Sequence, residues 1–274
     1  MKRRHLSFEC DGDTLVGSLD AADALVGLLI VTGGNELRCG PFGSHADIAD
    51  KIATAGFPVM RFDRRGVGDS SGANQGFAAS AADIAAALAA FRAACPRLKR
   101  IVAYGNCDAA SALMLAQGQG CDALVLANPW TLELEPDAEH EHSAEAEPQP
   151  QPQMTPRAIR AHYLRRLSNP AALWRLLSGK IQMRQMAGSL VAAVQPAPPA
   201  GTLVQDMAAG LAEFAGAATL LIAQHDRTGQ MFLARWDASD GRLRVCPKAG
   251  HSFIEPQARI WLLGQLLGAL RSLS

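Results

Sequence analysis

Short apolar segments that alternate with helical segments most constrain how this chain can fold. The clearest is Val26-Gly27-Leu28-Leu29-Ile30-Val31, which is typical of a strand buried on both faces of a parallel sheet. Similar segments lie at 57–62, 100–104, 123–127, 218–223 and 242–246, and helical ones at 44–55, 79–94, 108–117 and 256–271. This alternation predicts an α/β fold with a mostly parallel central sheet and helices on both faces. Residues 5–10 and 14–19 add an expected hairpin.

The alternation stops at residue 131 and resumes after residue 200. We therefore predict a core formed by 1–130 and 201–274, with 131–200 as a helical cap insert. Within the insert, residues 133–156 are acidic and then rich in proline and glutamine, which indicates a flexible loop. Residues 157–184 are basic and amphipathic. Their charge favours an anionic or carrier-linked substrate, while a solvated basic helix packed on the core is the alternative.

Composition excludes several classes of protein. Lys and Arg total 26, as do Asp and Glu, and this zero net charge argues against a dedicated nucleic-acid binder. No apolar run reaches the length of a transmembrane segment, and the basic N-terminus is not followed by a signal-like apolar stretch. We therefore expect a cytoplasmic location. The six cysteines are sparse and contain no C-x-x-C pair, so we expect reduced thiols, no metal site and no cofactor. The oligomeric state is left open.

A candidate nucleophile lies at Cys107, between a predicted strand and a predicted helix. The segment Gly105-Asn106-Cys107-Asp108-Ala109 has small residues two positions before and after the cysteine. A nucleophile on a sharp strand-to-helix turn needs such small neighbours because the backbone is crowded there. The N-terminus of the following helix favours a thiolate. The alternative is an inert cysteine that happens to precede a helix.

An acid and a base follow this cysteine in the chain, each just after a predicted strand. Asp226 follows the strand at 218–223, and His251 follows the strand at 242–246. A cysteine nucleophile needs a base to take or hold its proton, and the base needs an acid to fix its tautomer. We therefore predict a Cys107, His251 and Asp226 triad. Asp237 and Asp240 are weaker candidates for the acid, and His225 is expected to be structural.

The loop after the first parallel strand, Thr32-Gly33-Gly34-Asn35, is the candidate oxyanion site. Glycines there let backbone N–H groups approach a reacting carbonyl. We predict that the N–H groups of Gly34 and Asp108 form the oxyanion hole. Asn35 is a candidate further donor to the substrate, and Arg38 is a candidate for steering an anionic one. A plain tight turn is the alternative for this loop.

These features together resemble the α/β-hydrolase superfamily. Its nucleophile, acid and base occur in the order found here, and Asp63-x-Arg65-Gly66-x-Gly68-x-Ser70 is similar to a structural loop of that superfamily. The chain more closely resembles the exosortase A system-associated hydrolase 1 family. The matching features are Gly33-Gly34, Gly43-Ser44-His45, Gly105-Asn106-Cys107-Asp108-Ala109-Ala110-Ser111 and the insert segment from Tyr163 to Gly179. That resemblance implies serine aminopeptidase-like architecture with a cysteine at the elbow, and a link to bacterial exopolysaccharide biosynthesis.

The predicted activity is acyl transfer from an ester or thioester through an acyl-enzyme on Cys107, to water or to another acceptor. A thiolate suits substrates whose leaving groups need little protonation, so an esterase, thioesterase or acyltransferase is favoured over a peptidase. The expected partner is a small-molecule acyl ester or thioester. The alternative is a non-catalytic binding or assembly module on the same fold, in which Cys107 is unused.

Overall fold

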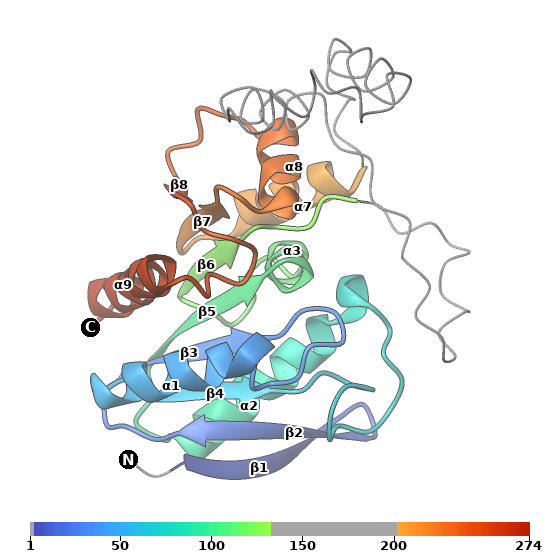
Figure 1. Cartoon of the computed structure of the whole chain (residues 1–274). Coiled ribbons are helices and arrows are strands. Elements are labelled where there is room, and N and C mark those ends of the chain that lie inside the picture. Colours follow the sequence, from blue (N-terminus) through green and yellow to red (C-terminus); the bar gives the residue numbers. More distant parts are fainter. Residues whose placement is uncertain (1–2, 133–201) are drawn as a thin grey trace, which may run out of the picture.

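The computed structural model describes residues 3–132 and 202–274, which form one eight-stranded sheet with helices on both faces (Figure 1). The predicted cap insert, including its acidic loop and its basic segment, lies outside the described residues except at its first two positions. The strand order is β1-β2-β4-β3-β5-β6-β7-β8. The strands are β1 (Arg3–Cys10), β2 (Asp13–Asp20), β3 (Val26–Val31), β4 (Val59–Phe62), β5 (Arg100–Asn106), β6 (Ala123–Ala127), β7 (Ala217–Ala223) and β8 (Leu243–Cys246).

The pairing of the strands confirms the predicted mostly parallel sheet. β1 and β2 form the expected antiparallel hairpin at one edge, and β2 is also antiparallel to β4. From β4 to β8 every neighbouring pair is parallel. Parallel strands share one carboxyl edge, so the loops that follow β3, β5, β6, β7 and β8 meet at the same place.

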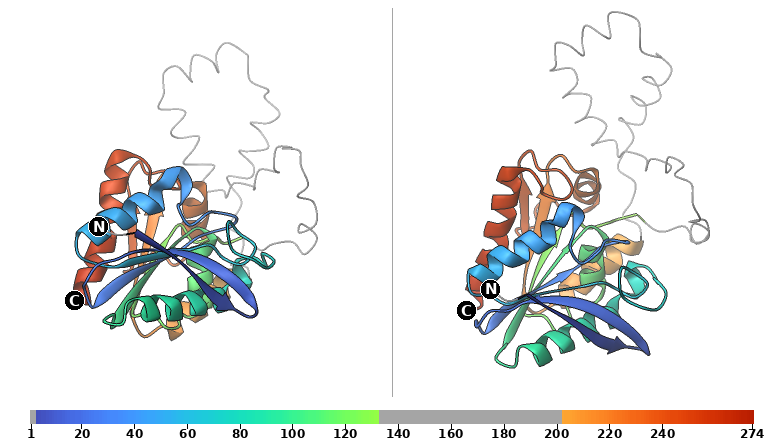
Figure 2. Two further views of the ribbon diagram at one scale, coloured as in Figure 1. Left: turned by 90° about the horizontal axis from the view of Figure 1, so that it is seen from below. Right: turned by 60° about the horizontal axis from the view of Figure 1, so that its bottom comes forward.

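Helices cover both faces of the sheet (Figure 2), and each face has its own cluster of buried apolar residues. On one face, α1 (Ser44–Thr54) and α9 (Pro256–Ser272) bury residues such as Ile52 and Leu266. On the other, α2 (Ala81–Ala94), α3 (Asp108–Leu115), α7 (Thr202–Glu213) and α8 (Arg227–Arg235) pack on a separate cluster. Two short 3-10 helices, Pro41–Gly43 and Phe77–Ala79, precede α1 and α2.

The helices α7 and α8 were not foreseen from the sequence. α7 packs closely on α3, where a Cβ added to Gly210 would lie 2.2 Å from the carbonyl oxygen of Met114. Gly210 is therefore the residue that lets the two helices approach. Because glycine has a low helix propensity, the presence of Gly210 makes this helix hard to predict from sequence. No helix within 3–132 or 202–274 combines the length and apolarity needed to cross a bilayer.

Candidate active site

The turn between β5 and α3 holds Cys107 in a strained backbone conformation, with φ 61° and ψ −127°. Tight packing enforces this turn. A Cβ on Gly105 would lie 2.7 Å from the carbonyl carbon of Ala109, and Ala109 itself is fully buried. Both flanking positions therefore require small residues, as the sequence pattern indicated. The strain places the Cys107 side chain at the carboxyl edge of the sheet, where it lines a cavity.

The structure brings the three predicted triad residues together, from the ends of β5, β7 and β8. Asp226 Oδ1 lies 3.0 Å from His251 Nδ1. The other carboxylate oxygen, Oδ2, accepts the N–H of Gly229 at 2.9 Å and so caps α8. This cap holds the buried carboxylate in one orientation, in which Oδ1 of Asp226 faces the imidazole. Asp237 and Asp240, the weaker candidates for the acid, bind instead to Ser239 and Arg242 in their own loop.

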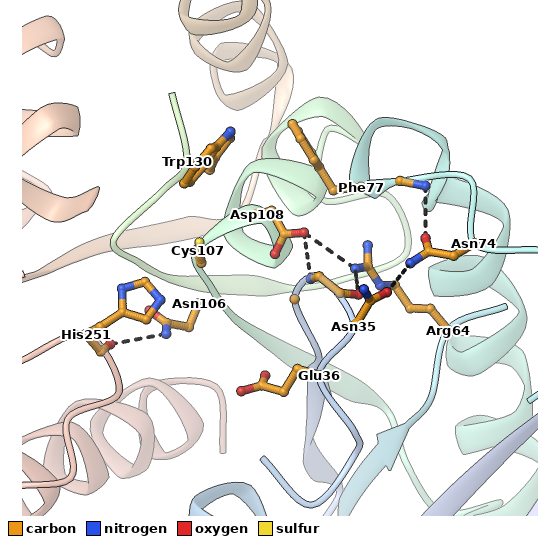
Figure 3. A pocket seen from close by; sticks show the side chains of 13 residues that line it. Asn35, Glu36, Arg64, Asn74, Phe77, Asn106, Cys107, Asp108, Trp130 and His251 are labelled. Carbon is orange, nitrogen blue, oxygen red and sulfur yellow. Dashed lines mark hydrogen bonds and ion pairs between the residues drawn. The ribbon is translucent and has the colours of Figure 1, made fainter. Parts of the chain in front are cut away.

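The surroundings of His251 favour its protonated form. Burial opposes protonation, but hydrogen bonds with Asp226 and with the Cys107 side chain outweigh it and raise the His251 pKa to about 10. An imidazole that favours its protonated form beside a cysteine sulfur is an environment typical of reactive cysteines. In Figure 3, His251 and Cys107 are seen on the same side of the cavity.

Two asparagines that sequence reasoning gave no role hold the His251 loop. Asn128 is fully buried and has a positive φ of 42°. Its Nδ2 donates to the His251 carbonyl at 3.1 Å and to Asn106 Oδ1 at 3.0 Å, while its Oδ1 accepts from the N–H of Ala223. Asn106 Nδ2 donates to the same His251 carbonyl at 3.2 Å. An Asn-Pro pair directly after a buried strand was the available signal for Asn128.

The oxyanion side differs from its predicted form. Gly34 and Asp108 do meet, but the Gly34 N–H donates to the Asp108 carboxylate at 2.7 Å. The carbonyl of the same glycine accepts from Arg64 Nη2 at 2.7 Å, and that nitrogen lies 3.5 Å from Asp108 Oδ2. A side-chain carboxylate therefore stands where the predicted donor would receive a reacting carbonyl. The sequence does not reveal this contact because the two residues are distant in the chain.

The predicted substrate-binding residues lie in different places. Asn35 lines the cavity, and its Oδ1 accepts a hydrogen bond from Asn74 Nδ2 at 2.8 Å. Arg38 does not line this cavity. Its guanidinium pairs with Asp63 and with Asp69, within the glycine-rich loop expected to be structural. Because its charge is already neutralised there, the placement of Arg38 argues against contact with a substrate.

The cavity is about 490 Å³ and combines an aromatic wall with an acidic one (Figure 3). Trp130 and Phe77 form the aromatic side. Glu36 and Asp108 are its carboxylates, and Arg64 is its guanidinium. Burial, opposed by a backbone hydrogen bond at Gly33 and assisted by the charge of Asp108, raises the Glu36 pKa to about 7. No cluster of three metal-ligating side chains occurs in the described part of the chain.

Glu36 also lies near a buried histidine without forming an ion pair with it. Glu36 Oε2 is 3.8 Å from His45 Nδ1, a nitrogen with no hydrogen-bond partner among the described residues. Burial, helped by the charge of Arg61, lowers the His45 pKa to about 4. His45 is thus neutral over the range in which Glu36 becomes charged, and the Glu36 carboxylate depends on its own partial exposure for solvation.

The comparisons with known proteins agree with this fold. Solved structures similar to the chain include the α/β hydrolase GrgF from Penicillium sp. sh18, at 13% identity, 99% coverage of both chains and a TM-score of 0.61. The Pyrococcus furiosus esterase Pf2001 is 13% identical, with 98% of this chain and 93% of that one covered and a TM-score of 0.58. Est1E from Butyrivibrio proteoclasticus, solved with ferulic acid bound, is 11% identical, with coverage of 97% and 99% and a TM-score of 0.59.

At such identities the similarity establishes the fold alone. No curated protein matches the chain significantly. The model of the alpha/beta hydrolase family, however, matches residues 40–260, which is most of the chain and spans Cys107, Asp226 and His251. Taken with the sheet order and the strand-to-helix elbow, this match means that the chain belongs to the alpha/beta hydrolase family.

Proposed function

We propose that this hydrolase cleaves an ester or thioester through Cys107, His251 and Asp226. One observation carries the proposal: a strained elbow presents the Cys107 thiol to an imidazole that is itself held by a capped, buried carboxylate. Each of the three groups has the neighbour that nucleophilic catalysis requires. The resemblance to the exosortase-associated family adds a proposed role beside bacterial exopolysaccharide systems.

The proposed reaction has two balanced stages. The Cys107 thiolate attacks the acyl carbon, a C–S bond forms, and the carbonyl π electrons move onto oxygen. When this intermediate collapses, the bond to the leaving alcohol or thiol breaks, and the His251 imidazolium supplies its proton. Water, deprotonated by the now neutral imidazole, then attacks the thioester carbonyl. The C–S bond breaks, which releases the carboxylic acid and restores the Cys107 thiolate beside the His251 imidazolium. An acceptor alcohol or amine in place of water would make the same site an acyltransferase.

The walls of the cavity support an uncharged acyl group. Trp130 and Phe77 offer apolar surface. The charges of Arg64 and His251 are offset by Asp108 and Glu36, so the cavity presents no excess positive charge to a carboxylate or phosphate. The basic segment 157–184, which favours an anionic carrier, lies outside the described residues. We therefore propose an apolar acyl chain at Cys107, with any anionic carrier bound by the insert.

The test is a panel of p-nitrophenyl esters and acyl-coenzyme A thioesters of graded chain length, with intact mass recorded beside turnover. The proposal expects an added acyl mass on the wild-type protein that Cys107→Ala abolishes. Cys107→Ser keeps a nucleophilic atom of similar size and reports whether the thiol itself is required. Turnover that persists in Cys107→Ala would rule the mechanism out.

The second candidate is a non-catalytic binding module. The observation that favours it is the Asp108 carboxylate on the Gly34 N–H, since a working oxyanion site needs that donor. The same mass measurement separates the two candidates, because a module would take no acyl group from any member of the panel.

A further inference from the structure

Asp108 contributes more to the cavity than the backbone N–H assigned to it from the sequence. Its side chain is about 15% exposed and turns back over the loop after β3, where Oδ2 accepts the Gly34 N–H at 2.7 Å. A Cβ on Gly33 would lie 2.2 Å from Asp108 Oδ1. The carboxylate is therefore seated against two consecutive peptide units, in a space that only glycine leaves open.

This seat coincides with the position that the proposed reaction needs. Oxyanion donors work when they lie about 2.7–3.1 Å from the developing O⁻. The Asp108 oxygen already occupies that distance from the Gly34 nitrogen. One N–H cannot serve two anions, and two anions that share one donor repel each other. The donor becomes available to a substrate only if the carboxylate moves.

Arg64 provides a place to which the carboxylate can move. Its side chain is only about 2% exposed and lies 3.5 Å from Asp108, just beyond a strong hydrogen bond. Nη1 donates to Ser80 and Nη2 to the Gly34 carbonyl, whereas the buried Nε has no hydrogen-bond partner among the described residues. Arg64 Nη2 and Asp108 Oδ2 thus already form a long ion pair, and a shift of the carboxylate toward the guanidinium would shorten and strengthen it.

We infer that the Asp108 side chain is a gate on the oxyanion donor of Gly34, closed in the free protein and opened when the substrate carbonyl displaces it toward Arg64. The inference rests on the proposed function. As the Cys107–acyl bond forms, the carbonyl oxygen takes the negative charge and accepts the Gly34 N–H, while the Asp108 carboxylate keeps its charge and shortens its existing 3.5 Å contact with Arg64. No proton or electron is transferred in the gating step itself. Asp108 acts here through Gly34 as a positioning residue.

The gate makes a prediction opposite to that for an ordinary active-site residue, because removal of the Asp108 carboxylate should speed acylation by small substrates. Asp108→Ala keeps the backbone N–H but frees the Gly34 donor. Asp108→Asn removes the charge but keeps an oxygen that can accept from Gly34. Comparison of the two variants separates the occupied donor from the electrostatic effect of the carboxylate on the sulfur.

The experiment measures two rates on Cys107 in the full-length protein. Acylation by p-nitrophenyl acetate uses an oxyanion donor, whereas alkylation by iodoacetamide forms no oxyanion and reports the reactivity of the thiol alone. We expect the ratio of acylation to alkylation to rise roughly tenfold or more in Asp108→Ala. In Asp108→Asn the ratio should rise much less. Circular dichroism checks that the variants are folded, and Asp108→Ser replaces the alanine variant if it is not.

Each other outcome has a defined meaning. If the wild type is acylated and the ratio in Asp108→Ala stays constant or falls, the gate is wrong while the proposed function stands. If alkylation proceeds but neither the wild type nor any variant is acylated, the proposed function fails and the gate fails with it. If the alanine and asparagine variants show equal increases, charge and not the occupied donor controls the site, which also overturns the gate.

Discussion

The two sides of the Cys107 site are assembled to different degrees. On the proton side, Asp226 and His251 already have the contacts that proton transfer needs, and two asparagines hold the histidine loop. On the oxyanion side, the loop donor Gly34 is engaged by a side chain of the protein itself. If Cys107 acts as proposed, the contrast means that the nucleophile has its proton-transfer partners in place before the substrate binds, whereas the oxyanion donor becomes available only with the substrate.

The largest expected effect is on the proton side. Asp226→Asn retains an oxygen that can cap α8, but it loses the charge that holds His251 protonated and oriented. We expect the acylation rate constant to fall by roughly 10²-fold or more, in keeping with the cost of this change in related triads. Stopped-flow acylation with p-nitrophenyl acetate measures the rate constant. Asp237→Asn, in a nearby exposed loop, is the matched control and should keep the wild-type rate, and equal losses in both would exclude Asp226 as the acid.

Asn128→Ala should cost about 2–3 kcal/mol in the free energy of unfolding. It deletes a fully buried amide and leaves the Ala223 N–H and the His251 carbonyl short of partners. Urea unfolding followed by fluorescence measures the loss. Acylation should also slow, because the His251 loop loses one of its two asparagine supports. A variant as stable as the wild type would show that water replaces the amide.

Gly33→Ala tests the oxyanion side sterically. The new methyl group would overlap Asp108 Oδ1, so we expect a loss of about 1–3 kcal/mol in stability. In an Asp108→Ala background the overlap is gone and most of that loss should be recovered. A double-mutant cycle of unfolding free energies measures this coupling. Additive losses would place the Asp108 side chain away from Gly33.

The smallest expected effect concerns Glu36. Its raised pKa means that burial penalises the charged form, so this penalty is absent below about pH 4.5 and complete above about pH 7. Glu36→Gln removes the ionisable group. Relative to the wild type, this variant should gain stability as the pH rises through that window, by about 1 kcal/mol once partial exposure is taken into account.

Thermal unfolding of both proteins at pH 4.5 and pH 8 checks this sign. Glu9→Gln, which changes an exposed carboxylate on β1, is the control and should show no such gain. A gain for Glu36→Gln that shrinks with rising pH would contradict a raised Glu36 pKa.

Much of this protein is determined by short segments of its sequence. Buried apolar runs such as Val26–Val31 predicted the parallel strands, because a strand covered on both faces must be apolar throughout. Gly105 and Ala109 predicted the elbow at Cys107, because steric crowding in a strand-to-helix turn acts over a few residues. The chain order of Cys107, Asp226 and His251 then placed all three at one edge of the sheet.

Only the tertiary structure decided which groups face one another across that edge. The bond from Gly34 to Asp108 joins residues 74 positions apart, and the support of His251 by Asn128 spans 123. Such contacts depend on strand order and on side-chain rotamers, which leave no local periodicity in a sequence. For the same reason Arg38 could be read as a free cation, whereas the fold pairs it with Asp63 and Asp69.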